Sequence, residues 1–352
     1  MTKTDASRLL SRCAQLLFTA ALVAGCGGGG SGGSSSPAKS SFTAGPITAT
    51  NSGSVVVKDT TFDVSSAKVA DDDDRARGEG DLKVGMLAEI EGGEITADTT
   101  GSRCNATNVT FRSAIIGPVD AINTSTRLLV VLGQTIDVLD TTVFDDRFPN
   151  GPFGIVVGDI IEIFGTLDTS TGHYVATRIE PAGDAPFFKL RGVVANLDIR
   201  ARTFTIGGET ISFARVPPHE IPAGLANGSL VTVKLQKEMA GGAWIAVTFQ
   251  NAVHQLAEHN EIKLKGRISD VLSATQFSVA GIPVDARSAK VRPDGATIFL
   301  GADVEVEGTV TNGIVIATKV EIEKDDEHGH GNKHENEHED EHEDDNEHKN
   351  KD

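Results

Sequence analysis

Positive charge and aromatic residues are scarce in this chain of 352 residues. Its 32 Lys and Arg stand against 50 Asp and Glu, which leaves a formal net charge of −18. No stretch gathers Lys and Arg into the basic stripe that phosphate binding needs. Aromatic residues make up 5%, with one Trp and one Tyr, so few side chains could stack on bases or sugars. We therefore expect no nucleic-acid partner.

The sequence also lacks a recognisable catalytic site. Between residues 42 and 324 it contains no phosphate-cradling glycine loop, and no nucleophile signature lies beside a histidine. The histidines of this region stand at unrelated positions: His173, His219, His254 and His259. We predict that the protein is not an enzyme and expect no firmly bound cofactor. The alternative is an active site that is assembled only in the fold.

Cysteine occurs three times, and the first two belong to the N-terminus. Residues 1–25, which include Cys13, form an export leader, because basic residues precede the apolar run 16–23. That run is too short to remain in a bilayer as a spanning helix. It ends in Leu-Val-Ala-Gly-Cys26, which resembles the bacterial lipobox. The resemblance implies cleavage before Cys26 and attachment of lipid, including palmitate, to that residue.

The residues after Cys26 suggest how the protein is held. In lipoproteins of diderm bacteria an aspartate after the lipidated cysteine commonly signals inner-membrane retention, and Gly27 stands there instead. The resemblance therefore implies the outer membrane, on its periplasmic or its surface face. Several acyl chains at one residue give stable anchoring. Residues 26–41 are rich in Gly and Ser and are expected to form a flexible tether.

A pattern that recurs four times organises the rest of the chain. Each copy opens with a glycine before β-branched residues, continues with a central glycine and an alternating apolar stretch, and ends on a strand built around an alanine. The period of about 70–75 residues suits a small domain rather than a solenoid repeat. We expect four such domains, which we call repeats 1 to 4, at residues 42–112, 113–182, 187–251 and 261–324.

Within each repeat the apolar residues alternate over four to eight positions, the period of half-buried strands. Five short strands, two glycine bends and a hairpin turn fit into each copy. A small closed barrel accommodates these elements and removes the unpaired edges that invite aggregation. We therefore predict an all-β protein of four tandem five-stranded barrels. They should be OB-like, with an SH3-like barrel as the alternative.

The combined motifs resemble a bacterial family known as domain of unknown function 5666. They are the opening Gly-[Val/Ile], the central Gly-x-x-[Val/Ile]-Glu-[Val/Ile]-x-Gly and the final Ala-Thr-x-[Val/Ile]. The resemblance covers about residues 42–324 and implies OB-like barrels, which occur in tandem in exported lipoproteins. It implies no biochemical activity. Repeat 3 departs most, because residues 228–235 lack the closing glycine and the acid.

Several acidic and buried positions in the repeats have simple interpretations. The run 71–74 is four aspartates without the spacing of a calcium loop, so we expect a solvated loop. The acids after the central glycine, Glu89, Glu162 and Glu305, should face solvent. A strand position shared by Cys104, Tyr174, Trp244 and Val315 should point inward or toward a neighbouring repeat. Cys104 would then be a small buried residue rather than a reactive thiol.

The C-terminal tail, residues 325–352, contains thirteen carboxylates and three lysines and should be disordered. Its histidines, several of them four residues apart, could share Zn²⁺, Ni²⁺ or Cu²⁺ with nearby carboxylates. The candidate ligands are His328, His330, His334, His338, His342 and His348. The alternative is a solvating tail that binds metals only incidentally.

These observations favour a membrane-anchored lipoprotein of the cell envelope that acts as a non-catalytic binding or scaffold module. Its partners would be the membrane, reached through the lipid anchor, and envelope proteins or glycans. The alternative is a lipoprotein that captures or buffers divalent metal ions with its tail and uses the barrels as a spacer.

Overall fold

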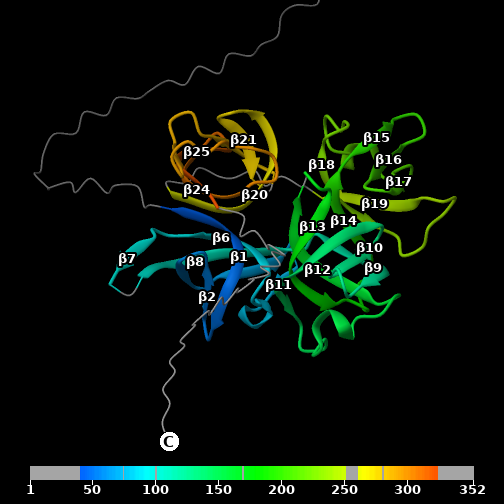
Figure 1. The fold of residues 1–352 in the computed structure, drawn as a ribbon, viewed down its shortest axis with the longest axis horizontal. Coiled ribbons are helices and arrows are strands. Elements are labelled where there is room, and N and C mark those ends of the chain that lie inside the picture. Colours follow the sequence, from blue (N-terminus) through cyan, green and yellow to red (C-terminus); the bar gives the residue numbers. More distant parts are fainter. Residues whose placement is uncertain are drawn as a thin grey trace, which may run out of the picture. The chain divides into compact units, whose positions relative to one another are not determined.

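The computed structural model describes residues 40–73, 75–99, 101–168, 170–250, 261–279 and 281–323, without the side chains of residues 98, 269, 270 and 272. Across these ranges the chain forms β-strands and three short 3-10 turns but no α-helix, so the predicted all-β class is confirmed (Figure 1). None of the described segments is a helix that could cross a membrane. Cys26, the tether and the six tail histidines lie outside the described residues.

Repeat 2 shows the plan of one barrel most simply. Its strands are β9 (Ile115–Asn123), β10 (Leu128–Val131), β11 (Gln134–Phe144), β12 (Ile160–Asp168) and β13 (His173–Pro181). β9, β10 and β11 pair as antiparallel hairpins, β11 pairs parallel with β13, and β12 joins β13 back to β9. This closed order, first-second-third-fifth-fourth, is that of an OB barrel. The OB-like prediction is therefore confirmed over the SH3-like alternative.

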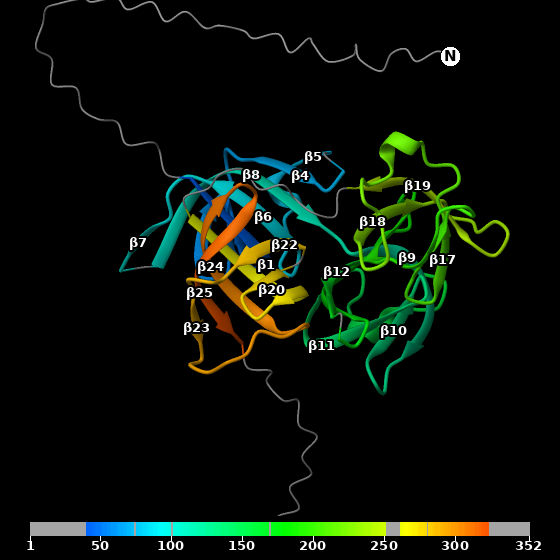
Figure 2. The ribbon, with the colours of Figure 1, turned by 90° about the horizontal axis from the view of Figure 1, so that it is seen from above.

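The other repeats follow the same order with local additions (Figure 2). Repeat 1 adds β4 and β5 in one loop and the short strand β7, whereas repeat 3 splits its first strand in two.

Repeat 1 contains β1 (Ser41–Asn51), β2 (Ser54–Val57), β3 (Thr60–Asp63), β4 (Lys68–Asp71), β5 (Ala76–Arg77), β6 (Leu87–Gly92), β7 (Thr96–Asp98) and β8 (Gly101–Arg112). Repeat 3 contains β14 (Phe188–Val193), β15 (Ala195–Asp198), β16 (Thr203–Ile206), β17 (Glu209–Ser212), β18 (Leu230–Leu235) and β19 (Trp244–Gln250). Repeat 4 contains β20 (Glu261–Ser273), β21 (Gln276–Val279), β22 (Ile282–Asp285), β23 (Lys290–Arg292), β24 (Asp303–Thr311) and β25 (Ile314–Ile322). The 3-10 turns are η1 (Glu79–Asp81), η2 (Gly151–Gly154) and η3 (Pro218–Glu220).

The opening and central glycine motifs of each repeat meet in the fold. In repeat 2 the amide of Gly158 donates to the carbonyl of Val119 at 2.8 Å, and the amide of Val119 donates to Asp159 at 2.8 Å. Gly158 has φ 92°, a left-handed conformation that glycine adopts without strain. The same pair of hydrogen bonds and a positive φ recur at Gly85, Gly228 and Gly301. Repeat 3, the most divergent in sequence, therefore keeps the same local geometry.

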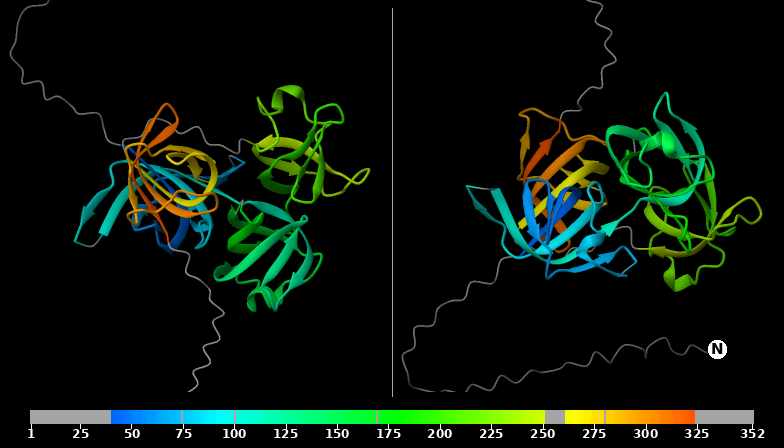
Figure 3. Two further views of the ribbon diagram at one scale, coloured as in Figure 1. Left: turned by 45° about the horizontal axis from the view of Figure 1, so that its top comes forward. Right: turned by 90° about the horizontal axis from the view of Figure 1, so that it is seen from below.

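Strand pairing also joins one barrel to another. β1 pairs parallel with β20 from Ser41 opposite Glu261 to Ala44 opposite Leu264, which links repeat 1 to repeat 4 (Figure 3, blue beside yellow). β9 pairs antiparallel with β14, which links repeat 2 to repeat 3. One hydrophobic core extends through repeats 2 and 3, and Phe42 of repeat 1 packs in the core of repeat 4. Contacts between repeats thus supplement the thin core of each barrel.

Candidate binding site

The aspartates between β4 and β5 do not form the solvated loop that the sequence predicts. Asp71 is buried, and the side chains of Asp72 and Asp73 are only 15% and 13% exposed. One carboxylate oxygen of Asp71 accepts the backbone amides of Asp73 and Arg75 at 3.0 Å, and the other accepts Nη2 of Arg77 at 2.7 Å. These bonds fold the loop back on itself. The solvated-loop prediction was wrong because Arg75 and Arg77 pair with the run within the loop, and further cations reach it from elsewhere in the chain.

Two of those cations belong to repeat 3. Lys189 Nζ of β14 lies 2.9 Å from Asp72, and Lys234 Nζ of β18 lies 2.5 Å from Asp73. Gln250 of β19 donates to the carbonyl oxygen of Asp72 at 3.0 Å. Burial alone would raise the pKa of Asp73, but Lys234, Arg75 and Lys189 together outweigh it and lower that pKa. The acidic loop of repeat 1 is therefore tied to three strands of repeat 3.

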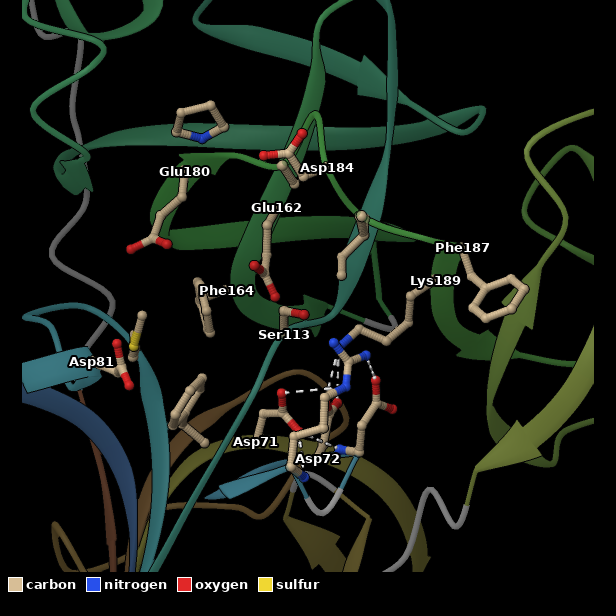
Figure 4. Close-up of a pocket in the computed structure, with 18 of the residues that line it drawn as sticks. Asp71, Asp72, Asp81, Ser113, Glu162, Phe164, Glu180, Asp184, Phe187 and Lys189 are labelled. Carbon is tan, nitrogen blue, oxygen red and sulfur yellow. Dashed lines mark hydrogen bonds and ion pairs between the residues drawn. The ribbon is translucent and has the colours of Figure 1, made fainter. Parts of the chain in front are cut away.

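A cavity of about 500 Å³ lies beside this loop (Figure 4). Repeats 1, 2 and 3 all contribute to its wall. Eight carboxylates and six basic side chains line it, so the wall carries an excess of acid. The exposed ring of Phe187 provides apolar surface beside the charges, whereas Phe111 and Phe164 behind the wall are buried in the core of repeat 1. The cavity thus combines acidic and aromatic groups, which suits a positively charged organic group.

Glu162 of β12 lies in this cavity beside Ser113 (Figure 4). Its side chain is partly buried and forms no ion pair with any described residue. Burial raises the pKa of its carboxyl, and Lys189 and Ser113 only partly oppose that shift. The prediction that Glu162 faces solvent is wrong, because repeats 1 and 3 close over the strand surface that carries it.

The two acids equivalent to Glu162 are not free in solvent either. Glu89 Oε2 lies 2.6 Å from Arg112 Nη2, and both side chains are largely buried. Glu305 pairs with Lys58 of repeat 1, whose side chain is 2% exposed. Burial lowers the pKa of Lys58 despite the attraction of Glu305. The solvent-face prediction is therefore wrong at all three positions, which lie at contacts within or between barrels.

The inward strand position was predicted correctly. Cys104, Tyr174, Trp244 and Val315 are all buried. The indole Nε1 of Trp244 donates to Glu209 at 2.8 Å, and the Tyr174 hydroxyl donates to the carbonyl of Arg191. Burial raises the pKa of the Cys104 thiol, which lies 3.5 Å from the Ser41 hydroxyl. The single Trp and Tyr therefore serve packing and offer no open stacking face.

The histidines of the described barrels stand apart from the cavity. His173 Nδ1 lies 3.2 Å from Asp137, and His219 is exposed beside Glu220. His254 and His259 fall in the undescribed segment 251–260. Among the described residues no three His, Cys, Asp or Glu side chains are placed to share a metal ion. The lipidation residue Cys26 and the candidate tail ligands, from His328 to His348, are likewise beyond the described part of the chain.

Comparison with protein families agrees with the repeat pattern. The model of the family described as Domain of unknown function (DUF5666) matches residues 44–99, 116–180 and 265–321, together about half of the chain. The chain belongs to this family. The three DUF5666 matches fall on repeats 1, 2 and 4, and repeat 3 shares their strand order. No curated protein matches the chain. The family description states no activity.

Proposed function

We propose that this DUF5666 protein is a non-catalytic binding module of the cell envelope, and that its cavity binds a small organic cation. Glu162 is the observation that carries the proposal. Its carboxylate lies in the cavity and has no ion-pair partner among the described residues, while nearby Lys189 is already paired with Asp72. An ammonium or guanidinium group would supply the missing positive charge at this position.

The size and lining of the cavity support the same ligand class. Its volume of about 500 Å³ lies within the range of about 300–1,000 Å³ that is usual for small-molecule sites. Phe187, whose side chain is 39% exposed, offers ring surface for an alkyl chain or for a cation–π contact. The excess of carboxylates disfavours anions and favours cations. A short alkyl chain with a cationic head group meets these requirements.

Calorimetric titration of the full chain with agmatine tests this function. We expect binding that weakens with added salt. Glu162→Gln should weaken it about tenfold, the effect of losing one charge-assisted hydrogen bond. Glu238→Gln is the matched control, because Glu238 is exposed in repeat 3 and does not line the cavity. Equal affinity of the parent and Glu162→Gln, or no binding by the parent, would contradict the proposal.

The envelope location rests on the lipobox-like run that ends at Cys26. We propose export, lipid attachment at Cys26 and residence in the outer membrane, with envelope proteins or glycans as further partners. Labelling of growing cells with radioactive palmitate should mark the parent and not Cys26→Ser. Fractionation of the same cells should then place the parent with the outer membrane. Label retained by Cys26→Ser would refute lipid attachment at this residue.

A second candidate function is capture of divalent metal by the tail. The sequences His-Glu-Asn-Glu-His at 334–338 and His-Glu-Asp-Glu-His at 338–342 repeat a four-residue histidine spacing that can chelate one ion. Titration with Zn²⁺ should show micromolar or tighter binding that disappears on truncation after Lys324. Identical heats from the full and truncated chains would exclude this function. The barrels would then remain as the binding part of the protein.

A further inference from the structure

Each barrel carries the same short projection, formed by the two residues before the positive-φ glycine together with that glycine. We call these projections tips, and they comprise residues 83–85, 156–158, 226–228 and 299–301 in repeats 1 to 4. All four are held by the same pair of backbone hydrogen bonds to the first strand. The tips are therefore equivalent in geometry and differ only in their side chains and surroundings.

The tip of repeat 1 is docked on repeat 2. Thr177 Oγ1 of β13 donates to the carbonyl of Gly85 at 2.6 Å, and Arg178 Nη1 donates to the carbonyl of Val84 at 3.1 Å. A Cβ at Gly85 would lie 2.5 Å from the carbonyl oxygen of Thr177, so the close approach requires glycine. The chain thus already contains one complete contact between a tip and a strand.

The strand that receives this tip has a bulge at the contact. The register of β12 and β13 shifts between Gly165 opposite Ala176 and Phe164 opposite Arg178, which leaves Thr177 opposite no residue of β12. The parallel partner β11 also skips Thr177. A bulge residue keeps backbone groups that the ladder does not use. Because the ladder leaves the backbone of Thr177 unused, a glycine tip can lie directly against this residue.

The tip of repeat 2 has the same geometry but is open. Val156 and Val157 are 60% and 64% exposed, and no heavy atom lies within 4 Å of a Cβ built on Gly158. By contrast, a Cβ on Gly301 of repeat 4 would meet Asp168 of repeat 2 at 2.8 Å. The tip of repeat 3 also has an uncovered glycine, Gly228, but carries the polar Asn227 before it. Among the described tips, that of repeat 2 combines an apolar surface with an uncovered glycine.

A second copy of the receiving bulge is exposed on repeat 4. β24 and β25 shift register between Gly308 opposite Ala317 and Glu307 opposite Lys319, so Thr318 takes the place of Thr177. Thr318 is exposed, and its hydroxyl donates to the carbonyl of Glu307 in its own barrel at 3.1 Å. Lys319 follows it, as Arg178 follows Thr177, and can donate to a carbonyl of an arriving tip. Repeat 1 has the same bulge at Thr107, but the neutral Asn108 follows it.

We propose that the tip of repeat 2, residues 156–158, docks on the Thr318–Lys319 bulge of β25 in a second copy of this chain. Val156 and Val157 would then be covered, and Gly158 would approach Thr318 as Gly85 approaches Thr177. Tip and bulge are different surfaces, so the contact is heterologous and further copies can add in a row. This self-association goes beyond the proposed function and does not depend on a ligand in the cavity.

Sedimentation velocity over a concentration series tests the contact on the full chain carrying Cys26→Ser, which removes the site of lipid attachment. We expect the average mass of this parent to rise with concentration. Val156→Asp/Val157→Asp and Thr318→Arg should each weaken association about tenfold, the loss expected for one hot-spot contact.

The matched controls are Ile199→Asp, at a position 63% exposed in repeat 3, and Thr107→Arg at the equivalent bulge of repeat 1. Both controls should associate like the parent.

Mixing the two defective variants gives the sharpest result. The tip variant keeps an intact bulge and the bulge variant keeps an intact tip, so an equimolar mixture should form dimers that grow no further. A parent that stays monomeric, variants that associate like the parent, or a mixture that stays monomeric would overturn the proposal. Loss of binding to phosphatidylglycerol vesicles by the tip variant, with self-association unchanged, would overturn it in favour of a membrane contact.

Discussion

At the scale of single residues, the glycines of one barrel are required for two different reasons. Gly158 adopts φ 92° in open space, so only its backbone conformation excludes other residues. Gly165 lies at the strand bulge, where a Cβ would stand 2.3 Å from the carbonyl oxygen of Val175. In repeat 3 Leu235 occupies the equivalent bulge, and β18 ends at that residue. The closing glycine is therefore needed where the paired strands continue beyond the bulge.

Alanine substitutions in repeat 2, with a control just after it, should separate these two reasons. Gly158→Ala should cost about 1–2 kcal/mol of unfolding free energy, the penalty of a left-handed backbone for an L-residue. Gly165→Ala should cost about 3 kcal/mol, because the backbone of β13 cannot yield as a side chain would. Gly183→Ala, which meets neither restriction, should be nearly neutral. Urea denaturation of the three variants measures the order, and a cost at Gly158 equal to that at Gly165 would contradict it.

Glu162 should make stability depend on pH in a direction unlike that of most carboxylates. Its folded-state pKa is raised by burial above the ordinary value of a glutamate. Its contribution to stability is therefore fully present below about pH 4.5 and is lost as the pH rises through the folded pKa. Glu162→Gln removes this loss, so the variant should gain in melting temperature over the parent at pH 8 and show little gain at pH 4.

The equivalent residue of repeat 1 is the control for this pH effect. Glu89→Gln removes the carboxylate that pairs with Arg112 and should lower the melting temperature at pH 8. A lower melting temperature for Glu162→Gln at pH 8 would show that the Glu162 carboxylate is satisfied in the folded protein. The cation-binding proposal would then lose its main support as well.

At the scale of strands and loops, the sequence predicted what depends on local pattern. Alternation located the strands, and the recurring glycines marked the bends and the bulges, because strand burial and glycine conformation are set within a few residues. The burial of the acidic loop was missed because the partners that hold it against repeat 3 are remote, with Lys189 standing 117 residues from Asp72. One signal was present: the aspartate run occurs in a single repeat, and features confined to one copy are not needed to close a barrel.

A double-mutant cycle on Asp72 and Lys189 measures how strongly the acidic loop is tied to repeat 3. The side chain of Lys189 is 6% exposed and that of Asp72 is 15% exposed, so either single change leaves a largely buried charge without its partner. Asp72→Asn and Lys189→Met should each cost about 3 kcal/mol, and the double variant should cost clearly less than their sum. Strictly additive costs, measured by urea denaturation, would show that the pair is not coupled.

At the scale of the whole molecule, the order of repeats along the chain does not determine which barrels support each other. Repeat 1 pairs its first strand with repeat 4, the most distant in sequence, and Phe164 of repeat 2 packs in the core of repeat 1. The repeat pattern could not predict these partners, because it is the same in each copy. Residues at these contacts should therefore affect the stability of a barrel other than their own.

Phe42 provides the test of this dependence between barrels. It is fully buried, is the second residue of β1 and packs among the core residues of repeat 4. Phe42→Ala should cost about 3–5 kcal/mol, and hydrogen exchange should speed up first in β24 and β25. Phe62→Ala removes an equally buried ring from the core of repeat 1, so its fastest new exchange should appear in β6 and β8. If both variants accelerated exchange first in repeat 1, Phe42 would belong energetically to its own barrel, and the Phe42 ring would not couple the two repeats.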